Sequence, residues 1–250
     1  MPRVLLLAGT TEATVLAGRL VALGAEVISS LAGVTRSPVG RAGLVRSGGF
    51  GGVEGLVRYL VEQSIDAVID ATHPFAAVMP FHAAAAAAAV QIPRCRLLRP
   101  AWQPVEGDRW VPVTDIEAAI VAVSREGARR VFLTVGRQTA GAFAACRDVQ
   151  FLVRAIEPIA GVLAGAEVVL QRGPFGLEDE IALLSTHGID TIVAKNSGGT
   201  ATAPKLAAAR QLGIRVIMID RPAQPAGPVT QFVEDAVDWF ERLSRAALRT

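Results

Sequence analysis

The sequence is poor in several residue types that enzymes commonly use for covalent or metal chemistry. It contains two cysteines, three histidines, one tyrosine and only two lysines. Cys95 and Cys146 stand alone, with no CxxC or Cys/His spacing, which excludes a zinc site of the ribbon or finger type and is typical of a reduced cytosolic protein. We expect both thiols to be packing residues and expect no metal site.

Charge of one sign is also lacking, since the formal net charge is only +2 over 250 residues. This balance indicates no nucleic-acid-binding surface, and a hydrophobic share of 51% excludes disorder. The longest alanine run, 83–89, is shorter than the roughly 20 apolar residues that span a membrane. Residues 1–7 suit a first strand better than a secretory signal, so we predict a soluble, cytoplasmic protein without a membrane or nucleic-acid partner.

Short apolar runs alternate with helically spaced segments, which predicts an α/β fold made of parallel βαβ units. Strands are expected at 3–8, 25–31, 67–70, 94–98, 131–135, 150–153, 167–170, 191–194 and 215–219. Helices are expected at 12–23, 53–63, 76–89, 116–125, 138–145, 178–186, 204–212 and 230–246. A stretch rich in proline and tryptophan at 99–112 is interpreted as an interdomain crossing. We therefore predict two Rossmann-like domains, 1–112 and 113–250, with parallel sheets flanked by helices and a ligand cleft between them.

The loop after the first strand carries Gly9, Thr10, Thr11 and Glu12 at the start of a helix. A helix N-terminus attracts phosphate through its unpaired N–H groups and its dipole. The GxGxxG fingerprint is absent, and the threonine hydroxyls are candidate replacement donors. The alternative is an ordinary helix cap at Thr10 or Thr11.

The second strand ends near Ser29 and Ser30 without the acidic residue that grips the ribose 2′-hydroxyl in NAD enzymes, which favours NADP. Arg36 and Ser37 lie downstream and could bind the extra phosphate. The alternative is a solvated loop with an exposed arginine.

The third strand leads into Asp70, Thr72, His73 and Pro74, where three polar side chains meet a predicted helix start. His73 could donate a proton or bind a substrate carboxylate because imidazole titrates near neutrality. It could equally be a structural cap.

In the second half, Thr134, Gly136 and Arg137 follow a predicted strand and resemble a second anion-binding turn. A further loop carries Lys195, Ser197 and Gly198, with donors and glycines that let backbone approach a ligand. Both lysines of the protein, Lys195 and Lys205, border this loop, so we expect Lys195 to contact a ligand.

The chain resembles the precorrin-6A reductase family, which includes the cobalt-precorrin-6A reductases. Five motifs carry the resemblance: Leu7-Ala8-Gly9-Thr10-Thr11-Glu12-Ala13, Asp70-Ala71-Thr72-His73-Pro74-Phe75-Ala76, Arg99-Pro100-Ala101-Trp102, Thr134-Val135-Gly136 and Ala194-Lys195-Asn196-Ser197-Gly198-Gly199. They span nearly the whole chain. The family's first loop often reads Gly-Gly-Thr, and Ala8 replaces the first glycine here.

The resemblance implies NADPH as the cofactor, a tetrapyrrole as the substrate and reduction of precorrin-6A to precorrin-6B, with channelling to neighbouring enzymes of the pathway. On this basis Gly9, Thr10, Thr11, Glu12, Arg36, Ser37 and Thr72 are expected to bind NADPH. Asp70 and His73 are expected at the reacting centre, and Thr134, Gly136, Arg137, Lys195, Ser197 and Gly198 are expected to bind substrate carboxylates. The alternatives are a cobalt-containing substrate or an NADP-sensing module without chemistry. A short-chain dehydrogenase is excluded, because that chemistry needs Tyr and Lys four apart and Tyr59 is followed by Gln63.

Overall fold

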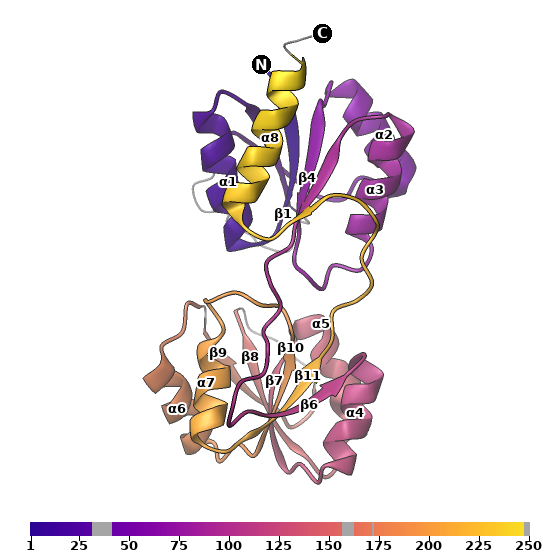
Figure 1. Cartoon of the computed structure of the whole chain (residues 1–250). Coiled ribbons are helices and arrows are strands. Elements are labelled where there is room, and N and C mark those ends of the chain that lie inside the picture. The colour runs from indigo at the N-terminus through magenta and orange to yellow at the C-terminus, as the bar shows by residue number, and fades with distance from the viewer. Residues whose placement is uncertain (32–41, 157–162, 172, 248–250) are drawn as a thin grey trace. The chain divides into compact units, whose positions relative to one another are not determined.

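A computed structural model describes residues 1–31, 42–156, 163–171 and 173–247 of the chain (Figure 1). It divides into two compact units. Unit 1 comprises residues 1–99 and 222–250, and unit 2 comprises residues 100–221. Each unit has its own six-stranded sheet, in which every neighbouring pair of strands is parallel. The predicted fold class is confirmed.

The sheet of unit 1 has the spatial order β12-β5-β4-β1-β2-β3. Its strands are β1 (Arg3–Ala8), β2 (Glu26–Leu31), β3 (Leu44–Ser47), β4 (Ala67–Ala71), β5 (Arg94–Leu97) and β12 (Val229–Thr230). Val4 to Leu7 are almost completely buried, as a strand covered on both faces requires.

Two pairs of helices cover the two faces of this sheet (Figure 1). On one face lie α1 (Thr11–Ala22) and α8 (Val233–Ala247), whose Leu16, Leu20 and Phe240 share one apolar core. On the other lie α2 (Gly52–Glu62) and α3 (Met79–Ala89). The alanine run forms α3, whose small side chains allow close packing on the sheet.

The sheet of unit 2 has the order β6-β11-β10-β7-β8-β9. Its strands are β6 (Arg109–Val113), β7 (Arg130–Thr134), β8 (Gln150–Ala155), β9 (Glu167–Leu170), β10 (Thr191–Lys195) and β11 (Arg215–Ile219). Its helices are α4 (Ile116–Arg125), α5 (Arg137–Ala140), a 3₁₀ turn at Gly141–Ala145, α6 (Leu177–Thr186) and α7 (Pro204–Gln211). Within the described residues, no helix of either unit is long and apolar enough to cross a membrane.

The predicted domain boundaries differ from the division that the structure shows. Unit 2 already begins at Pro100, because β6 lies in the predicted crossing and pairs with β11. The chain returns to unit 1 after Arg221, where β12 pairs with β5. The edge strand β12 of unit 1 therefore comes from a different part of the chain than its five companions, a pairing that local patterns cannot reveal.

Two predicted helices start later in the structure than expected, for physical reasons. The predicted helix at 76–89 starts at Met79 with Pro80 in its first turn, while Pro74 lies in a turn closed by the Ala76 N–H and the His73 carbonyl. The predicted helix at 230–246 begins at Val233, because Val229–Thr230 pairs as β12. The short edge strand β3 and the strand β6 were not predicted.

Candidate functional site

The carboxyl ends of β1 and β4 mark the topological switch point of unit 1, because the chain runs outward from these neighbours in opposite directions. Ligands of open parallel sheets bind at such points. A small hollow there is lined by Thr10, Glu12, Thr72, Pro74, Leu97 and Arg99. The structure thus brings together the loops after the first and third predicted strands.

Thr10 is the N-cap of α1, as the structural alternative proposed. Its Oγ1 accepts from the Ala13 N–H at 3.2 Å and donates to the Ala71 carbonyl at 3.1 Å. The hydroxyl hydrogen is therefore used within the protein. The backbone N–H groups of Thr11 and Glu12 lie in the same first turn, where a helix has no intrahelical acceptors to offer. A phosphate at this end would be held by backbone and dipole more than by the Thr10 hydroxyl.

Gly9 joins β1 to α1 and lies against the next loop. A Cβ at this position would lie 3.6 Å from the backbone nitrogen of His73 and 3.8 Å from the Thr72 Cα, which is ordinary van der Waals contact. The absent side chain leaves the two loops directly adjacent.

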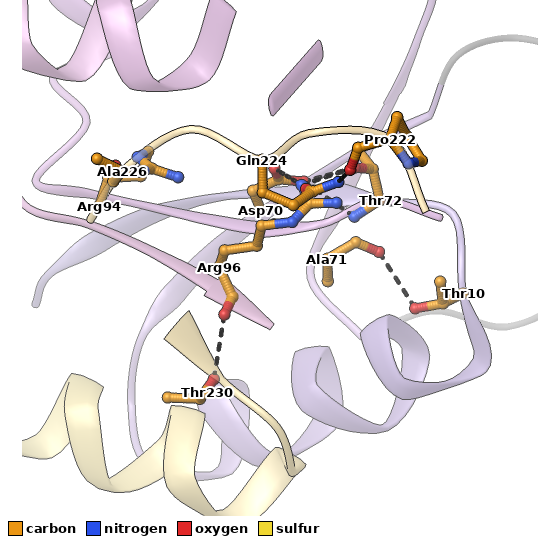
Figure 2. Close-up of polar contacts among 10 residues, drawn as sticks. All are labelled: Thr10, Asp70, Ala71, Thr72, Arg94, Arg96, Pro222, Gln224, Ala226 and Thr230. Atoms are coloured by element: carbon orange, nitrogen blue, oxygen red, sulfur yellow. Dashed lines mark hydrogen bonds and ion pairs between the residues drawn. The ribbon is translucent and has the colours of Figure 1, made fainter. Parts of the chain in front are cut away.

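Asp70 is completely buried at the end of β4 and forms an ion pair with Arg96 of β5 (Figure 2). Its Oδ1 also accepts from the Thr72 N–H at 3.0 Å and from the Thr72 hydroxyl at 2.7 Å. A carboxylate enclosed in this way holds its neighbours and does not face a ligand. This arrangement argues against direct chemistry by Asp70, while Thr72 lines the hollow.

His73 is exposed, and its Nδ1 accepts from the Phe75 N–H at 3.2 Å. In the neutral ring this hydrogen bond places the imidazole hydrogen on Nε2. Nε2 is then the ring nitrogen that carries the hydrogen.

Glu12 and Arg99 form an ion pair beside the start of α1, with 2.9 Å between Arg99 Nη1 and Glu12 Oε2. Sequence reasoning assigned Glu12 to the cofactor and placed Arg99 in the crossing. The pair instead puts a guanidinium at the rim of the hollow, next to the helix terminus. Its charge offsets the Glu12 carboxylate, which alone would repel a phosphate.

Arg36 and Ser37 lie outside the described residues. Near the end of β2, a different arginine is present: Arg46 of β3 donates to Ser30 Oγ at 2.7 Å and to the Gly48 carbonyl at 3.0 Å. Its guanidinium stacks on Phe50, 3.9 Å from the ring centroid. The end of the second strand therefore carries a cation where NAD enzymes carry a carboxylate.

The switch point of unit 2 lies between β7 and β10 and gathers the predicted substrate residues. The Thr134 hydroxyl donates to the Val193 carbonyl at 3.0 Å, and Gly136 follows with a φ of +87°. Lys195 Nζ donates to Thr139 Oγ1 at 3.2 Å, and burial lowers the pKa of this lysine. Arg137 begins α5, and its side chain lies outside the described part of the structure.

The loop after β10 has a structural role that sequence reasoning missed. Asn196 Oδ1 accepts from the Trp102 N–H at 2.8 Å, and its Nδ2 donates to the Trp102 carbonyl at 3.1 Å. Arg221 Nε donates to the Asn196 carbonyl at 2.8 Å. The loop thus anchors both segments through which the chain enters and leaves unit 2.

Gly198 of this loop is required by packing. Its φ is +66°, and a Cβ there would lie 2.0 Å from the Pro100 carbonyl oxygen. Ser197 is buried beside it. Gly198 was predicted to bind substrate, and the structure supplies an independent reason for the glycine.

Four side chains near the two switch points escaped sequence reasoning: Arg46, Arg96, Arg99 and Asn196. A usable signal existed for one of them. Arg94 and Arg96 alternate within a short strand that should be buried, and buried charges require partners.

Two parallel sheets of Rossmann strand order, each with glycine and hydroxyl residues at its switch point, define a two-domain Rossmann-type α/β protein. A family model described as precorrin-6x reductase CbiJ/CobK matches residues 3–241. The chain belongs to this family.

Individual relatives agree with this assignment over nearly the full length. The chain is 49% identical to a precorrin-6A reductase of Mycobacterium tuberculosis, covering 91% of this chain and 92% of the relative. It is 30% identical to a cobalt-precorrin-6A reductase of Priestia megaterium, covering 94% and 96%. A solved structure of the CobK precorrin-6A reductase superposes with a TM-score of 0.91 at 43% identity, covering 97% of each chain.

Proposed function

We propose that this protein reduces one double bond of the precorrin-6A macrocycle with NADPH, giving precorrin-6B in cobalamin biosynthesis. The proposal rests on one observation: over nearly its whole length, the chain is similar in sequence and in fold to proteins named precorrin-6A reductase. The positions of the two switch-point loops support it, because they offer an anion site in each unit.

The cofactor site is proposed at the switch point of unit 1. NADPH, when bound, supplies the hydride. The first turn of α1 would hold its phosphates through backbone N–H groups, with the Arg99 guanidinium nearby. Thr72 and His73 would lie beside the reacting part of the cofactor, because their loop contacts Gly9. Positioning and exclusion of water do most of the work in hydride transfer, which suits a site without a nucleophile.

The preference for NADPH over NADH is proposed to rest on the end of β2. Ser30 and Arg46 present a hydroxyl and a cation there, and an arginine is the usual partner of a 2′-phosphate. Arg36 and Ser37 remain predicted partners from the adjoining loop.

This cofactor preference can be tested with Arg46→Ala and Arg36→Ala. The KM for NADPH is expected to rise about tenfold where the arginine contacts the 2′-phosphate, while the KM for NADH stays nearly constant. Arg58→Ala on α2 is a matched control, because its side chain is not assigned to the cofactor. Unchanged discrimination in both variants would refute the assignment of the 2′-phosphate to these arginines.

The macrocycle is proposed to place its carboxylates at the switch point of unit 2. Lys195 there supplies an ammonium, and Gly136 and Ser197 supply backbone and hydroxyl donors. The expected cleft shared by the two units stays a prediction. His73 Nε2 is the atom proposed to donate to the substrate, while Asp70 acts through its neighbours.

A metal-free substrate is favoured by the relatives. The precorrin-6A reductase named above is 49% identical to this chain and the cobalt-precorrin-6A reductase only 30%. A cobalt-containing substrate remains the alternative for the assay.

The decisive experiment follows NADPH absorbance at 340 nm after addition of precorrin-6A, cobalt-precorrin-6A or buffer. We expect oxidation of NADPH with the metal-free substrate and formation of a dihydro product by mass spectrometry. Binding of NADPH without substrate-dependent oxidation would refute the proposed reaction and favour a sensing module.

A further inference from the structure

A buried ion pair lies next to Thr72, at the end of β4 (Figure 2). Arg96 of β5 and Asp70 of β4 have no exposed side-chain surface. Removing two charges from water costs several kcal/mol per ion, and well-packed apolar residues often stabilise a core as well or better. The pair is therefore poorly explained by stability alone.

The pair holds Thr72 in place from several directions. Asp70 Oδ1 accepts from the N–H of Thr72 at 3.0 Å and from its hydroxyl at 2.7 Å, while Asp70 Oδ2 accepts from Arg96 Nη1. Arg96 Nη1 also lies 3.4 Å from Thr72 Oγ1. Because that hydroxyl donates its hydrogen to Asp70, it can only accept from Arg96.

The same network reaches the start of α1. The Ala71 carbonyl, between Asp70 and Thr72, accepts from the Thr10 hydroxyl, and Thr10 Oγ1 caps α1 by accepting from Ala13. A displacement of the loop would therefore disturb the helix terminus on the other side of the hollow. Arg96 thus connects β5, the end of β4 and the cap of α1 through consecutive hydrogen bonds.

The returning segment before β12 covers this cluster. The Arg96 N–H donates to the Pro228 carbonyl at 3.0 Å, and Arg94 Nη2 donates to the Ala226 carbonyl at 2.7 Å. Gln224 Nε2 donates to the Pro222 carbonyl at 2.7 Å (Figure 2).

Several buried polar atoms of this cluster also lack a hydrogen-bond partner, which adds to the free-energy cost of burying it. Within the described residues, Arg96 Nε and Nη2, Arg94 Nη1 and Gln224 Oε1 are buried without a hydrogen-bond partner. Burial lowers the pKa of Arg94. A side chain retained at such a cost is expected to serve something other than stability.

We propose that Arg96 is a positioning residue of the reductase, which acts through Asp70 to hold Thr72 and the adjoining loop at the switch point of unit 1. This role rests on the proposed function. Arg96 itself does not contact the ligands, because Asp70 and Thr72 lie between its guanidinium and the hollow.

The test replaces both charges together with Asp70→Leu/Arg96→Met, so that no lone charge stays buried. We expect a thermal midpoint at or above that of the wild type, because the apolar pair avoids desolvation. We expect kcat to fall at least about tenfold and the dissociation constant of NADPH to rise by a smaller factor, because the loop is displaced directly and the start of α1 only through the hydrogen bond between Thr10 and Ala71.

A matched control removes a second buried ion pair, in unit 2. Arg154 and Glu180 form two hydrogen bonds of 2.7 and 3.1 Å and lie far along the chain from Thr72. The variant Arg154→Met/Glu180→Leu is expected to keep kcat within about twofold. Equal losses in the two double variants would overturn the positioning role, as would wild-type kcat in Asp70→Leu/Arg96→Met.

Should that double variant fail to fold, Arg96→Lys decides the question. A lysine keeps a cation near Asp70, but it is shorter and lacks the planar fork that reaches both Asp70 and Thr72. We expect it to fold with kcat reduced about fivefold at an unchanged KM, and unchanged kcat would overturn the inference. A wild-type protein that does not oxidise NADPH with precorrin-6A would instead refute the proposed function itself.

Discussion

At the scale of single residues, Lys195 shows what partial burial does to a cationic side chain. Lys195 is partly buried, and its ammonium donates to Thr139 Oγ1. Burial lowers the pKa of Lys195, so the charged form costs stability below that pKa, and the cost is relieved as the pH rises through it. A bound carboxylate would offset the same cost.

Lys195 therefore gives a prediction about alkaline pH. The KM for the tetrapyrrole should begin to rise at a lower pH than an ordinary lysine would give, because burial lowers the pKa of Lys195 and the ammonium loses its proton while the substrate carboxylates stay ionised. Steady-state kinetics of the wild type and of Lys195→Arg provide the measurement. Arginine stays charged at alkaline pH, so the rise should disappear in that variant. A rise of equal size in both proteins would show that another group titrates.

Gly198 gives a second prediction, because the effect of its positive φ on stability can be distinguished from the effect of a steric clash. Gly198 and Gly213 have φ values of +66° and +65°, but only Gly198 would place a Cβ against backbone, at 2.0 Å from the Pro100 oxygen. Gly213→Ala is expected to lower the free energy of unfolding by about 1 kcal/mol, and Gly198→Ala by clearly more. Urea unfolding measures both, and equal losses would contradict the close approach to Pro100.

At the scale of elements, α1 depends on Thr10 for its cap and for its link to the loop after β4. Thr10→Ala is expected to lower the free energy of unfolding by about 1 kcal/mol and to weaken NADPH binding, because both hydrogen bonds are lost. Thr10→Ser keeps the hydroxyl and should behave like the wild type. Chemical denaturation and fluorescence titration with NADPH test both effects, and wild-type behaviour of Thr10→Ala would contradict them.

Some helices and strands could be predicted from local sequence patterns alone. The strands at 3–8 and 215–219 and the helix at 116–125 were predictable, because apolar runs, caps such as Asp115 and clear periodicity all favour one state. By contrast, Val229–Thr230 is a strand only because β5 offers it hydrogen bonds, with Thr230 opposite Leu97. Two residues carry too little local preference to reveal this.

At the scale of the whole molecule, unit 1 is completed by the last part of the chain. Ala236, Val237 and Phe240 of α8 share a core with Leu16 and Leu20 of α1. The stability of the proposed cofactor unit therefore depends on residues more than 200 positions from its first strand.

This dependence predicts that Phe240→Ala destabilises unit 1. Phe240 is 4% exposed, and its removal should lower the free energy of unfolding by about 3–5 kcal/mol. Hydrogen exchange should lose protection in residues 1–99 more than in 100–221. Phe232→Ala is the matched control, because Phe232 is 56% exposed and should cost less than about 1 kcal/mol. Uniform loss of protection across both units would contradict independent cores.

The sequence by itself determined the α/β class, the two parallel sheets, most element positions and the loops at their carboxyl ends. These follow from local periodicity and from the chemistry of glycine, threonine and lysine near strand ends. The family motifs lie in these same loops, which explains why function could be inferred before any geometry was known.

Only the tertiary structure decided which residues of those loops line the hollow of unit 1 and which form hydrogen bonds that hold the protein together. Asp70 was predicted at the reacting centre and is buried against Arg96, and Asn196 lies in a predicted ligand loop and anchors Trp102. The structure likewise decided that β12, near the end of the chain, pairs with β5 in unit 1, while β6 pairs with β11 in unit 2. The reason is physical: ion pairs, close contacts and edge-strand pairing join residues far apart in sequence, and no local pattern records the partner.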